Sequence, residues 1–423
     1  MAGRSAARHR RWRPGTGRRR RAGLSERHRA AGGTPAQRRR AEGGGGARRG
    51  RPRARAAARR APHAAAETRR PVPVTDTPLY RALRYQAASC ADLGSPFMAR
   101  LLRLVAARLT PGTPLTDRLF GWEGEIGPQG ASVPLRLAGA LHALKLEGEP
   151  RLAAVYPPAT ADEEALWHAV SDVLADRAEE IGAIVDSPPQ TNEVRRATAV
   201  LAALTWLGAR HPGPVTLSEL GASAGLNLLA DRFAVATPTG TLGATDPVLT
   251  LTPAWRGGVP DGPAPLVVAR RGCDIRPLDP VQDRRRILSY LWPDQAERLA
   301  LTEAALGAAA SQPPGAEPAL DRADAGAWLR ARLWAPWTGL HLVYHTIAWQ
   351  YFPPDTQTMA TEALEAAGSR THAGCPLAWL AMEADGQTPG AALTLRLWPG
   401  GATHRLGRID YHGRWIDWQA PAL

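Results

Sequence analysis

The stretch that decides the fold is ELGASAGLNL, residues 219–228. It ends a short apolar run, Val215–Leu220, which is typical of a buried strand, and it leads into a helical segment. Gly221 permits a tight turn with positive φ, and Gly225 lets the start of a helix pack closely against its neighbours. The stretch is therefore predicted to be the glycine-rich turn of a strand–turn–helix unit in an α/β sheet.

Three interpretations of this turn are open. Glu219, Gly221 and Gly225 fit the loop that holds S-adenosylmethionine (SAM) in methyltransferases. Residues 221–225 also read G-x-S-x-G, the elbow that exposes a nucleophilic serine, here Ser223, in hydrolases. The third interpretation is a tight turn without a ligand. A hydrolase elbow lies deep in its sheet, whereas the strand before this turn looks like the first of its domain, so the topology favours the cofactor loop.

The chemistry of the turn also favours a cofactor. In open α/β sheets, ligands bind in the crevice at the carboxyl ends of the strands. Glu219 stands at such an end, and a carboxylate is complementary to the ammonium and sulfonium groups of SAM. Ser223 and Asn227 offer neutral hydrogen bonds to the amino-acid part of the cofactor.

The rest of the chain divides into three parts. Residues 1–76 are predicted to be a disordered tail rich in Arg, Ala and Gly, residues 77–190 a helical subdomain, and residues 191–423 a Rossmann-like domain with a mostly parallel sheet. Helices are expected from Ser95-Pro96 onward and at Leu135–Leu146, Glu163–Val185, Val194–Ala209, Val281–Leu306 and Thr358–Ala367. Further strands are expected at Leu266–Arg270, Leu340–Thr346, Leu393–Trp398 and Arg405–Tyr411, the last two forming a hairpin.

Charge and cysteine content limit the class of protein. The net charge of +14 belongs to the tail, because residues 1–70 carry 23 Arg and 3 Glu and the remainder has a balance of −6. Contact with nucleic acid is therefore expected only through the tail, if the tail's composition reflects more than GC-rich coding. The longest apolar run, Ala197–Ala209, falls short of the ~20 residues of a membrane span. Three scattered cysteines indicate neither a disulfide framework nor a metal site, so we expect a cytoplasmic protein.

Seven stretches together resemble DUF2332, a bacterial family of undefined function. They are GSPFMARLL (94–102), PPQTNEVRRA (188–197), ELGASAGLNLLADRF (219–233), RRGCDIRPLD (270–279), WPDQ (292–295), HTIAWQYFPP (345–354) and DYHGRWIDW (410–418). The family resembles class I SAM-dependent methyltransferases preceded by a helical region. The resemblance implies a Rossmann-like class I sheet with SAM as cofactor. The hypothesised reaction is methyl transfer from SAM to an unidentified small molecule.

The class I pattern then implies further cofactor residues. Its second strand ends in an acid for the ribose hydroxyls, and Asp274 is the best match although it lies 55 residues after Glu219. Asp231 is nearer and stays an alternative. An insertion over Thr239–Gly262, with a hairpin through Val248–Thr252, is expected to account for the gap. RADAGAWL (322–329) resembles the third-strand stretch that binds adenine, which makes Asp324 a candidate.

Substrate and catalytic groups are expected near the same crevice. Ser187 and Gln190 fit a helix cap, and Gln190 and Asn192 are also predicted to bind the substrate. Glu193 and His345, the latter at the end of the predicted fourth strand, are the candidate catalytic groups.

Two rival functions stay open. The first is a serine hydrolase with Ser223 as nucleophile, an acid such as Asp355, and His404 or His412 completing the triad. The second is a binding module that keeps the nucleotide pocket without catalysis.

Overall fold

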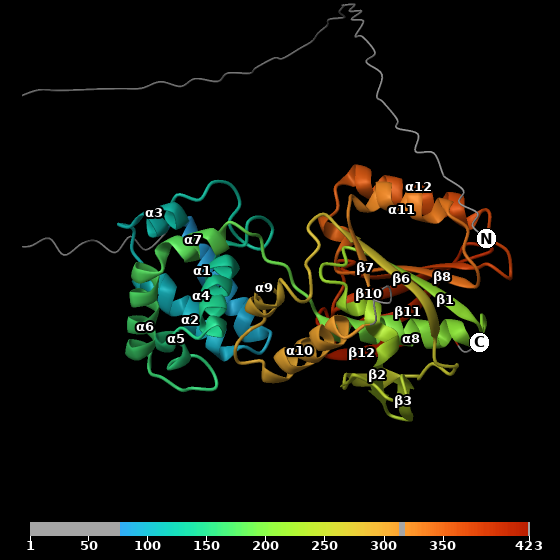
Figure 1. Ribbon diagram of the computed structural model, residues 1–423, viewed down its shortest axis with the longest axis horizontal. Coiled ribbons are helices and arrows are strands. Elements are labelled where there is room, and N and C mark those ends of the chain that lie inside the picture. The colour runs from blue at the N-terminus through green and yellow to red at the C-terminus, as the bar shows by residue number, and fades with distance from the viewer. Residues whose placement is uncertain (1–76, 313–317, 422–423) are drawn as a thin grey trace, which may run out of the picture. The chain divides into compact units, whose positions relative to one another are not determined.

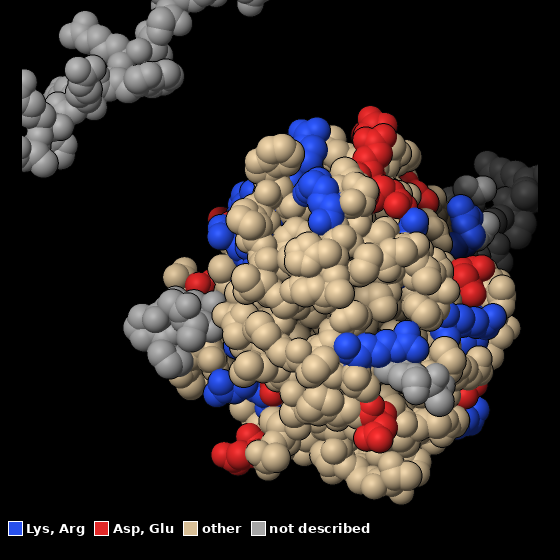
Figure 2. All heavy atoms as spheres, turned by 90° about the vertical axis from the view of Figure 1, so that its right-hand side faces the viewer, with Lys and Arg blue, Asp and Glu red and all other residues tan. Residues whose placement is uncertain are grey.

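The computed structural model describes residues 77–312 and 318–421 (Figure 1). The predicted Arg-rich tail, residues 1–76, lies outside the described residues. On the face shown in Figure 2, basic and acidic side chains are mixed over a largely uncharged surface. No helix in the described part of the chain combines the length and apolar character that a membrane span requires.

The first described region is helical. Its helices are α1 (Pro78–Asp92), α2 (Pro96–Arg108), α3 (Pro114–Phe120), α4 (Val133–Glu147), α5 (Pro150–Ala153), α6 (Glu163–Asp176) and α7 (Ala178–Val185). Ser95 caps α2 as predicted, because its hydroxyl accepts a hydrogen bond from the Met98 N–H at 3.3 Å. The single helix predicted over Glu163–Val185 is two helices, since the chain leaves helical geometry at Arg177.

A nine-stranded sheet forms the second region. Its strands are β1 (Pro214–Leu220), β5 (Ala254–Gly257), β6 (Leu266–Asp274), β7 (Ala319–Arg322), β8 (Leu340–Thr346), β9 (Leu377–Glu383), β10 (Ala391–Trp398), β11 (Ala402–Ile409) and β12 (Trp415–Trp418). Their spatial order is β5-β12-β11-β10-β9-β8-β1-β6-β7. Strands β7, β6, β1, β8 and β9 are parallel, and β10, β11 and β12 continue the sheet in antiparallel pairs. The predicted mixed α/β class with a mostly parallel sheet is confirmed, as is the β10–β11 hairpin.

Helices cover both faces of this sheet. On one face lie α8 (Ala197–Gly208) and α10 (Ala296–Ala310), and on the other lie α11 (Ala325–Trp334) and α12 (Pro354–Gly368) (Figure 1). The two cores are separate: α8 packs with Leu342 and Tyr344 of β8, whereas α11 and α12 pack with Val343. Neighbouring strand residues thus point to opposite layers, as the period-2 geometry of a strand requires.

The helix predicted over Val281–Leu306 is also two helices. Helix α9 (Arg284–Ser289) ends before Pro293, and α10 begins after it. Proline lacks the N–H that would continue the helical hydrogen bonds, and its ring clashes with the preceding turn, so the helix ends before Pro293.

The insertion between β1 and β6 differs in part from the prediction. The short helix η2 (Leu226–Arg232) leads into a small second sheet of β2 (Phe233–Thr237), β3 (Gly240–Gly243) and β4 (Leu249–Leu251), in the order β3-β2-β4. The predicted hairpin through Val248–Thr252 is wrong. Strand β4 pairs in parallel with β2, and β5 leaves to join β12, while the hairpin lies earlier, between β2 and β3.

The order of the parallel strands fixes where a ligand would bind. From β1 the chain moves outward through β6 to β7, and then returns to the other side of β1 to form β8 and β9. The direction of winding therefore reverses between β1 and β8. In open α/β sheets the crevice at the carboxyl ends of the strands beside such a reversal is the usual ligand site.

Candidate functional site

A cavity of about 550 Å³ lies at this reversal point. Its lining comes from the loops that follow β1, β6, β7 and β8 and from the segment before α8. The lining residues are Pro188, Pro189, Gln190, Thr191, Arg196, Gly221, Ser223, Cys273, Asp274, Ile275, Arg276, Ala323, Asp324, Ala325, Ile347, Ala348, Tyr351, Phe352, Pro353 and Thr356. The volume is in the range of cavities that hold a small molecule or cofactor.

The glycine-rich turn forms one wall of the cavity. Gly221, Ser223 and Gly225 have φ values of 72°, 51° and 68°, the left-handed region that glycine adopts at least cost. The N–H groups of Gly221 and Ala222 both donate to the carbonyl of Cys273, at 2.9 and 3.0 Å, which ties the turn to β6. A Cβ on Gly221 would lie 2.7 Å from the Cβ of Ala348. The turn therefore needs glycine here for its backbone conformation and for its contact with the opposite wall.

Two carboxylates at successive strand ends reach the cavity. Asp274 ends β6, and its two oxygens accept hydrogen bonds from the N–H groups of Ser223 at 3.0 Å and Arg276 at 2.8 Å. Asp324 follows β7 and caps α11 through the Ala327 N–H at 3.0 Å, and it also accepts the Thr356 hydroxyl. Burial opposes ionisation of Asp324, but these hydrogen bonds outweigh it and lower the pKa. Both side chains are held in place and keep acceptor capacity for a ligand.

Glu219 lies behind the turn and is not part of the cavity lining. It is 3% exposed, and its Oε2 accepts a hydrogen bond from the Tyr344 hydroxyl at 3.2 Å. Burial raises the pKa of Glu219 to about 8, against the Tyr344 hydrogen bond; the charge of Asp274 raises it further and that of Arg196 lowers it. Glu219 was predicted to bind the cofactor directly. Its side chain does not reach the cavity, because the alternation of side chains along the strand turns it toward Tyr344.

His345 is also outside the lining. It is 1% exposed, its Nδ1–H donates to Glu383 at 2.7 Å, and its Nε2 accepts from the Trp379 indole at 3.0 Å. Both ring nitrogens are thus engaged, so neither is free to take a proton from a substrate. The same Glu383 oxygen accepts the N–H groups of Ala348 and Trp349, at 2.9 and 3.1 Å. His345 therefore helps to fix the wall segment that begins at Ala348.

The residues predicted around position 190 divide between the cavity and its support. Gln190 lines the cavity, where its amide donates to the carbonyl of Arg276 at 2.8 Å and accepts from Arg286 at 3.2 Å. The Asn192 side chain instead accepts the Ala224 N–H at 3.0 Å, and Asn227 donates to the carbonyl of Glu193 at 3.3 Å. Asn192 and Asn227 therefore dock this segment onto the turn and do not face the cavity.

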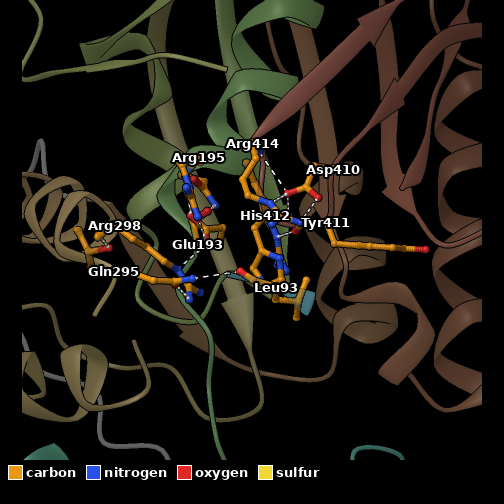
Figure 3. Close-up of polar contacts among 12 residues, drawn as sticks. Leu93, Glu193, Arg195, Gln295, Arg298, Asp410, Tyr411, His412 and Arg414 are labelled. Carbon is orange, nitrogen blue, oxygen red and sulfur yellow. Dashed lines mark hydrogen bonds and ion pairs between the residues drawn. The ribbon is translucent and has the colours of Figure 1, made fainter. Parts of the chain in front are cut away.

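Glu193 belongs to a separate cluster of charged side chains, the arginine network (Figure 3). Its members are Glu193, Arg195, Arg298, Asp410, His412 and Arg414. Glu193 is 2% exposed and lies 2.7 Å from Nε of Arg298 and 3.1 Å from Nε of Arg195. Burial opposes its ionisation, but the two guanidinium groups outweigh burial and keep the pKa of Glu193 below its ordinary value. A carboxylate held in this way is a structural ion-pair partner and a poor general base.

The hydrolase interpretation requires a histidine hydrogen-bonded to the Ser223 hydroxyl, and the described residues do not provide one. The nearest polar partner of the Ser223 hydroxyl is the Gln190 amide at 3.5 Å, and no histidine of the described residues is hydrogen-bonded to Ser223. His404 packs against Trp206, and His412 lies in the arginine network of Figure 3. The described residues also bring together no group of three or more His, Cys, Asp or Glu suited to a metal ion.

Arg196, Tyr351 and Phe352 line the cavity and are not among the predicted site residues. Arg196 donates to the carbonyls of Tyr411 and Thr346, at 2.9 and 3.0 Å, and burial lowers its pKa. Tyr351 and Phe352 supply aromatic surface to the cavity. All three lie inside the quoted stretches 188–197 and 345–354, but nothing in those stretches distinguishes them from core residues.

Comparison with known protein families matches the chain to one of them. The family model described as "Uncharacterized protein conserved in bacteria (DUF2332)" matches residues 80–418. The chain belongs to the DUF2332 family. The match spans the helical region and the sheet, so the whole cavity lies within the DUF2332 domain. Neither the curated proteins nor the solved structures include a match to the chain.

Proposed function

We propose that the protein binds SAM in the 550 Å³ cavity and transfers its methyl group to a small molecule. One observation carries the proposal. The glycine turn after β1 and the carboxylates Asp274 and Asp324, at the ends of the next two parallel strands, line one cavity. The resemblance to class I methyltransferases expects these three elements at these three places.

The strand order supports the proposal. Numbered along the chain, the parallel strands β1, β6, β7, β8 and β9 lie in the order 3-2-1-4-5, which agrees with the first five strands of the dinucleotide-binding order 3-2-1-4-5-6. The second small sheet and β5 lie between the first two parallel strands in sequence. This insertion accounts for the 55 residues between Glu219 and Asp274, and it leaves Asp274 at the expected strand end. Asp231, the alternative acid, is held instead by Arg270 at 2.8 Å.

The lining residues have the chemistry that SAM requires. Asp274 supplies acceptors for ribose hydroxyls, and Asp324 supplies an acceptor for the adenine amino group. Arg196 supplies positive charge for the carboxylate of the amino-acid part, and Tyr351 and Phe352 supply aromatic surface. When bound, SAM supplies an electrophilic methyl group. The lining contains no histidine, so the contribution of this chain to the rate is mainly proximity and alignment of the acceptor.

The first test is calorimetric titration of the full chain with SAM and with S-adenosylhomocysteine. We expect both to bind, and Asp274→Ala to weaken SAM binding about tenfold, the effect of losing roughly one charge-assisted hydrogen-bond site. Asp261→Ala is the matched control, because Asp261 is exposed and does not line the cavity. No binding of either nucleotide at high protein concentration would reject the proposal. Binding without methyl transfer to any acceptor would leave the non-catalytic module.

Gly221→Ala tests the role of the turn. The new Cβ would meet Ala348 at 2.7 Å and would hold an L side chain at φ 72°, so we expect a loss of about 1–2 kcal/mol in stability and a several-fold loss in SAM affinity. Gly386→Ala is the control, because Gly386 has φ 75° with nothing within 4 Å of its Cβ position. Thermal denaturation should show that both variants lose stability, and titration should show that Gly221→Ala alone loses SAM affinity. Equal SAM affinity in the two variants would argue against a cofactor role of the turn.

A further inference from the structure

A second cavity, of about 300 Å³, lies beside the arginine network of Figure 3. The start of α10, the segment around Arg195 and the turn between β11 and β12 form it. Its lining residues are Leu93, Arg195, Trp292, Asp294, Gln295, Ala296, Glu297, Arg298, His412 and Arg414. Three guanidinium groups, those of Arg195, Arg298 and Arg414, thus meet at one cavity.

Each of these arginines is fixed on one side by a buried acid or amide. Nε and Nη2 of Arg195 donate to Glu193, and Nε and Nη2 of Arg414 donate to Asp410. Arg298 pairs with Glu193 through Nε and donates to Gln295 through Nη1. Within the described residues, Nη1 of Arg195, Nη1 of Arg414 and Nη2 of Arg298 form no hydrogen bond, since the bonds of these side chains use their other nitrogens. The arginines are therefore held in place by two carboxylates while part of each donor fork stays available, an arrangement suited to binding an oxyanion.

The start of α10 adds to the positive potential of this cavity. Its N-cap residue, Gln295, makes no side-chain cap hydrogen bond, and the next three residues line the cavity. The first N–H groups of a helix have no partner within the helix, and the helix dipole places partial positive charge there. In a helix of 15 residues this end favours an anion.

An adjoining cavity of about 270 Å³ offers space for the rest of a ligand. It shares Leu93, Trp292, Arg298 and His412 with the first cavity, and its other walls are mostly apolar. His142, which is 2% exposed, also lines it. Nδ1 of His142 lies 3.2 Å from the carbonyl of Ser289 and must donate to it, so Nε2 carries a lone pair, and this buried atom has no partner. Burial lowers the pKa of His142 to about 4, which keeps the ring neutral and able to accept a hydrogen bond.

Two acids also line the first cavity, and they differ in their effect. Both oxygens of Asp294 are used at the start of α2, by the Ser95 hydroxyl at 2.5 Å and the Phe97 N–H at 2.9 Å. Glu297 is exposed and forms no hydrogen bond or ion pair within the described residues. Asp294 is thus a structural cap whose charge remains, and Glu297 is the acid in the lining that can be neutralised without removing a cap.

We propose that these two adjoining cavities form a second ligand site, which binds a small organic molecule through a carboxylate or phosphate group. The oxyanion is held by Arg195, Arg298 and Arg414. The apolar body of the ligand lies in the adjoining cavity, where Nε2 of His142 accepts a hydrogen bond from it. The site does not depend on the proposed binding of SAM, because its charged residues are not part of the SAM cavity.

The test uses three probes with the full chain at constant ionic strength: inorganic phosphate, benzoate and the neutral benzamide. We expect phosphate or benzoate to raise the thermal midpoint and to bind in calorimetry, and benzamide to do neither. Arg414→Gln should weaken oxyanion binding at least fivefold, and Glu297→Gln should strengthen it at least twofold. Arg405→Gln, an exposed arginine of β11 outside both cavities, should leave it unchanged.

The outcomes separate the sources of the oxyanion. Tighter binding of phosphate assigns a phosphorylated ligand, and tighter binding of benzoate assigns a carboxylic acid. Glu297→Gln keeps the test decisive even where Arg414→Gln loses stability, because Glu297 is exposed and supports no other group. Two results would overturn the proposal. One is benzamide binding as tightly as benzoate, and the other is an oxyanion affinity that neither substitution changes.

Discussion

Replacing Glu193 with glutamine is expected to lower the free energy of unfolding by about 3–5 kcal/mol, a large part of the stability of an ordinary domain. Glu193 is buried and pairs with Arg298, which is itself buried, and with Arg195. Glutamine keeps the shape of the side chain but removes the charge, so the largely buried guanidinium of Arg298 loses its counter-ion. Leaving one charge of such a pair uncompensated costs far more than the intact pair contributes.

Urea denaturation at neutral pH measures this effect. Glu303→Gln is the matched control, because Glu303 pairs with Arg284 at 3.1 Å but both side chains are about half exposed. An exposed pair is worth less than about 1 kcal/mol, so the control should unfold almost like the parent protein. Adding Arg298→Gln to Glu193→Gln should recover part of the lost stability, since both members of the pair are then neutral. Similar denaturation midpoints for Glu193→Gln and Glu303→Gln would show that the buried pair is not formed.

The same residue shows where sequence reasoning reached its limit. Glu193 was predicted to face the crevice because it precedes the first strand and its polar character is not explained by a helix cap. Its partner Arg298, which decides its role, lies 105 residues later on α10, and no local sequence pattern predicts that contact. Strand β8, Leu340–Thr346, was predicted with its observed bounds because its signal is local. An apolar run of that length can be recognised without knowing what packs on it.

The candidate site was predictable to the same extent. The glycine turn is predicted by its strand–turn–helix pattern, and Asp274 and Asp324 by the resemblance to the class I pattern. Gly221, Ser223, Asp274 and Asp324 line the cavity, whereas Gly225 does not. His345 was expected at the crevice because β8 ends there, and β8 does end there. The direction of its side chain depends on Glu383 and Trp379 from β9, a strand that is not among those predicted from the sequence. Position along a strand is thus local information, whereas the face and partners of a side chain are not.

Replacing Glu219 with glutamine is expected to change how stability depends on pH. The pKa of Glu219 is raised to about 8 in the folded protein from an ordinary value of 4.5, mainly by burial. The folded state therefore holds a proton that the unfolded chain releases above pH 4.5. The contribution of protonated Glu219 to the stability of the fold is fully present below pH 4.5 and is lost as the pH rises toward 8. Each pH unit in this window costs about 1.4 kcal/mol, so roughly 4 kcal/mol is lost between pH 5 and pH 8.

Glutamine resembles the protonated carboxyl group and cannot ionise, and it can still accept the hydrogen bond from Tyr344. We therefore expect Glu219→Gln to match the parent protein near pH 4.5 and to exceed its stability by a few kcal/mol at pH 8. Urea denaturation at each pH from 5 to 8 gives the difference between the two proteins. Other groups cancel in this difference, including the buried His142 and His341, whose lowered pKa values, about 4 and about 3, reduce stability on the acid side of 6.5.

Glu362→Gln is the control for this measurement, because Glu362 is an exposed glutamate of α12 and should leave the pH profile unchanged. The charge of Asp274 raises the pKa of Glu219 and that of Arg196 lowers it, and both of these groups line the proposed SAM cavity. A positively charged ligand there should favour ionised Glu219 and release its proton, which titrations in buffers of different ionisation enthalpy would detect. A stability difference between Glu219→Gln and the parent that stays constant from pH 5 to pH 8 would show that Glu219 is not held protonated. Such a result would also remove the electrostatic link between this carboxyl and the cavity.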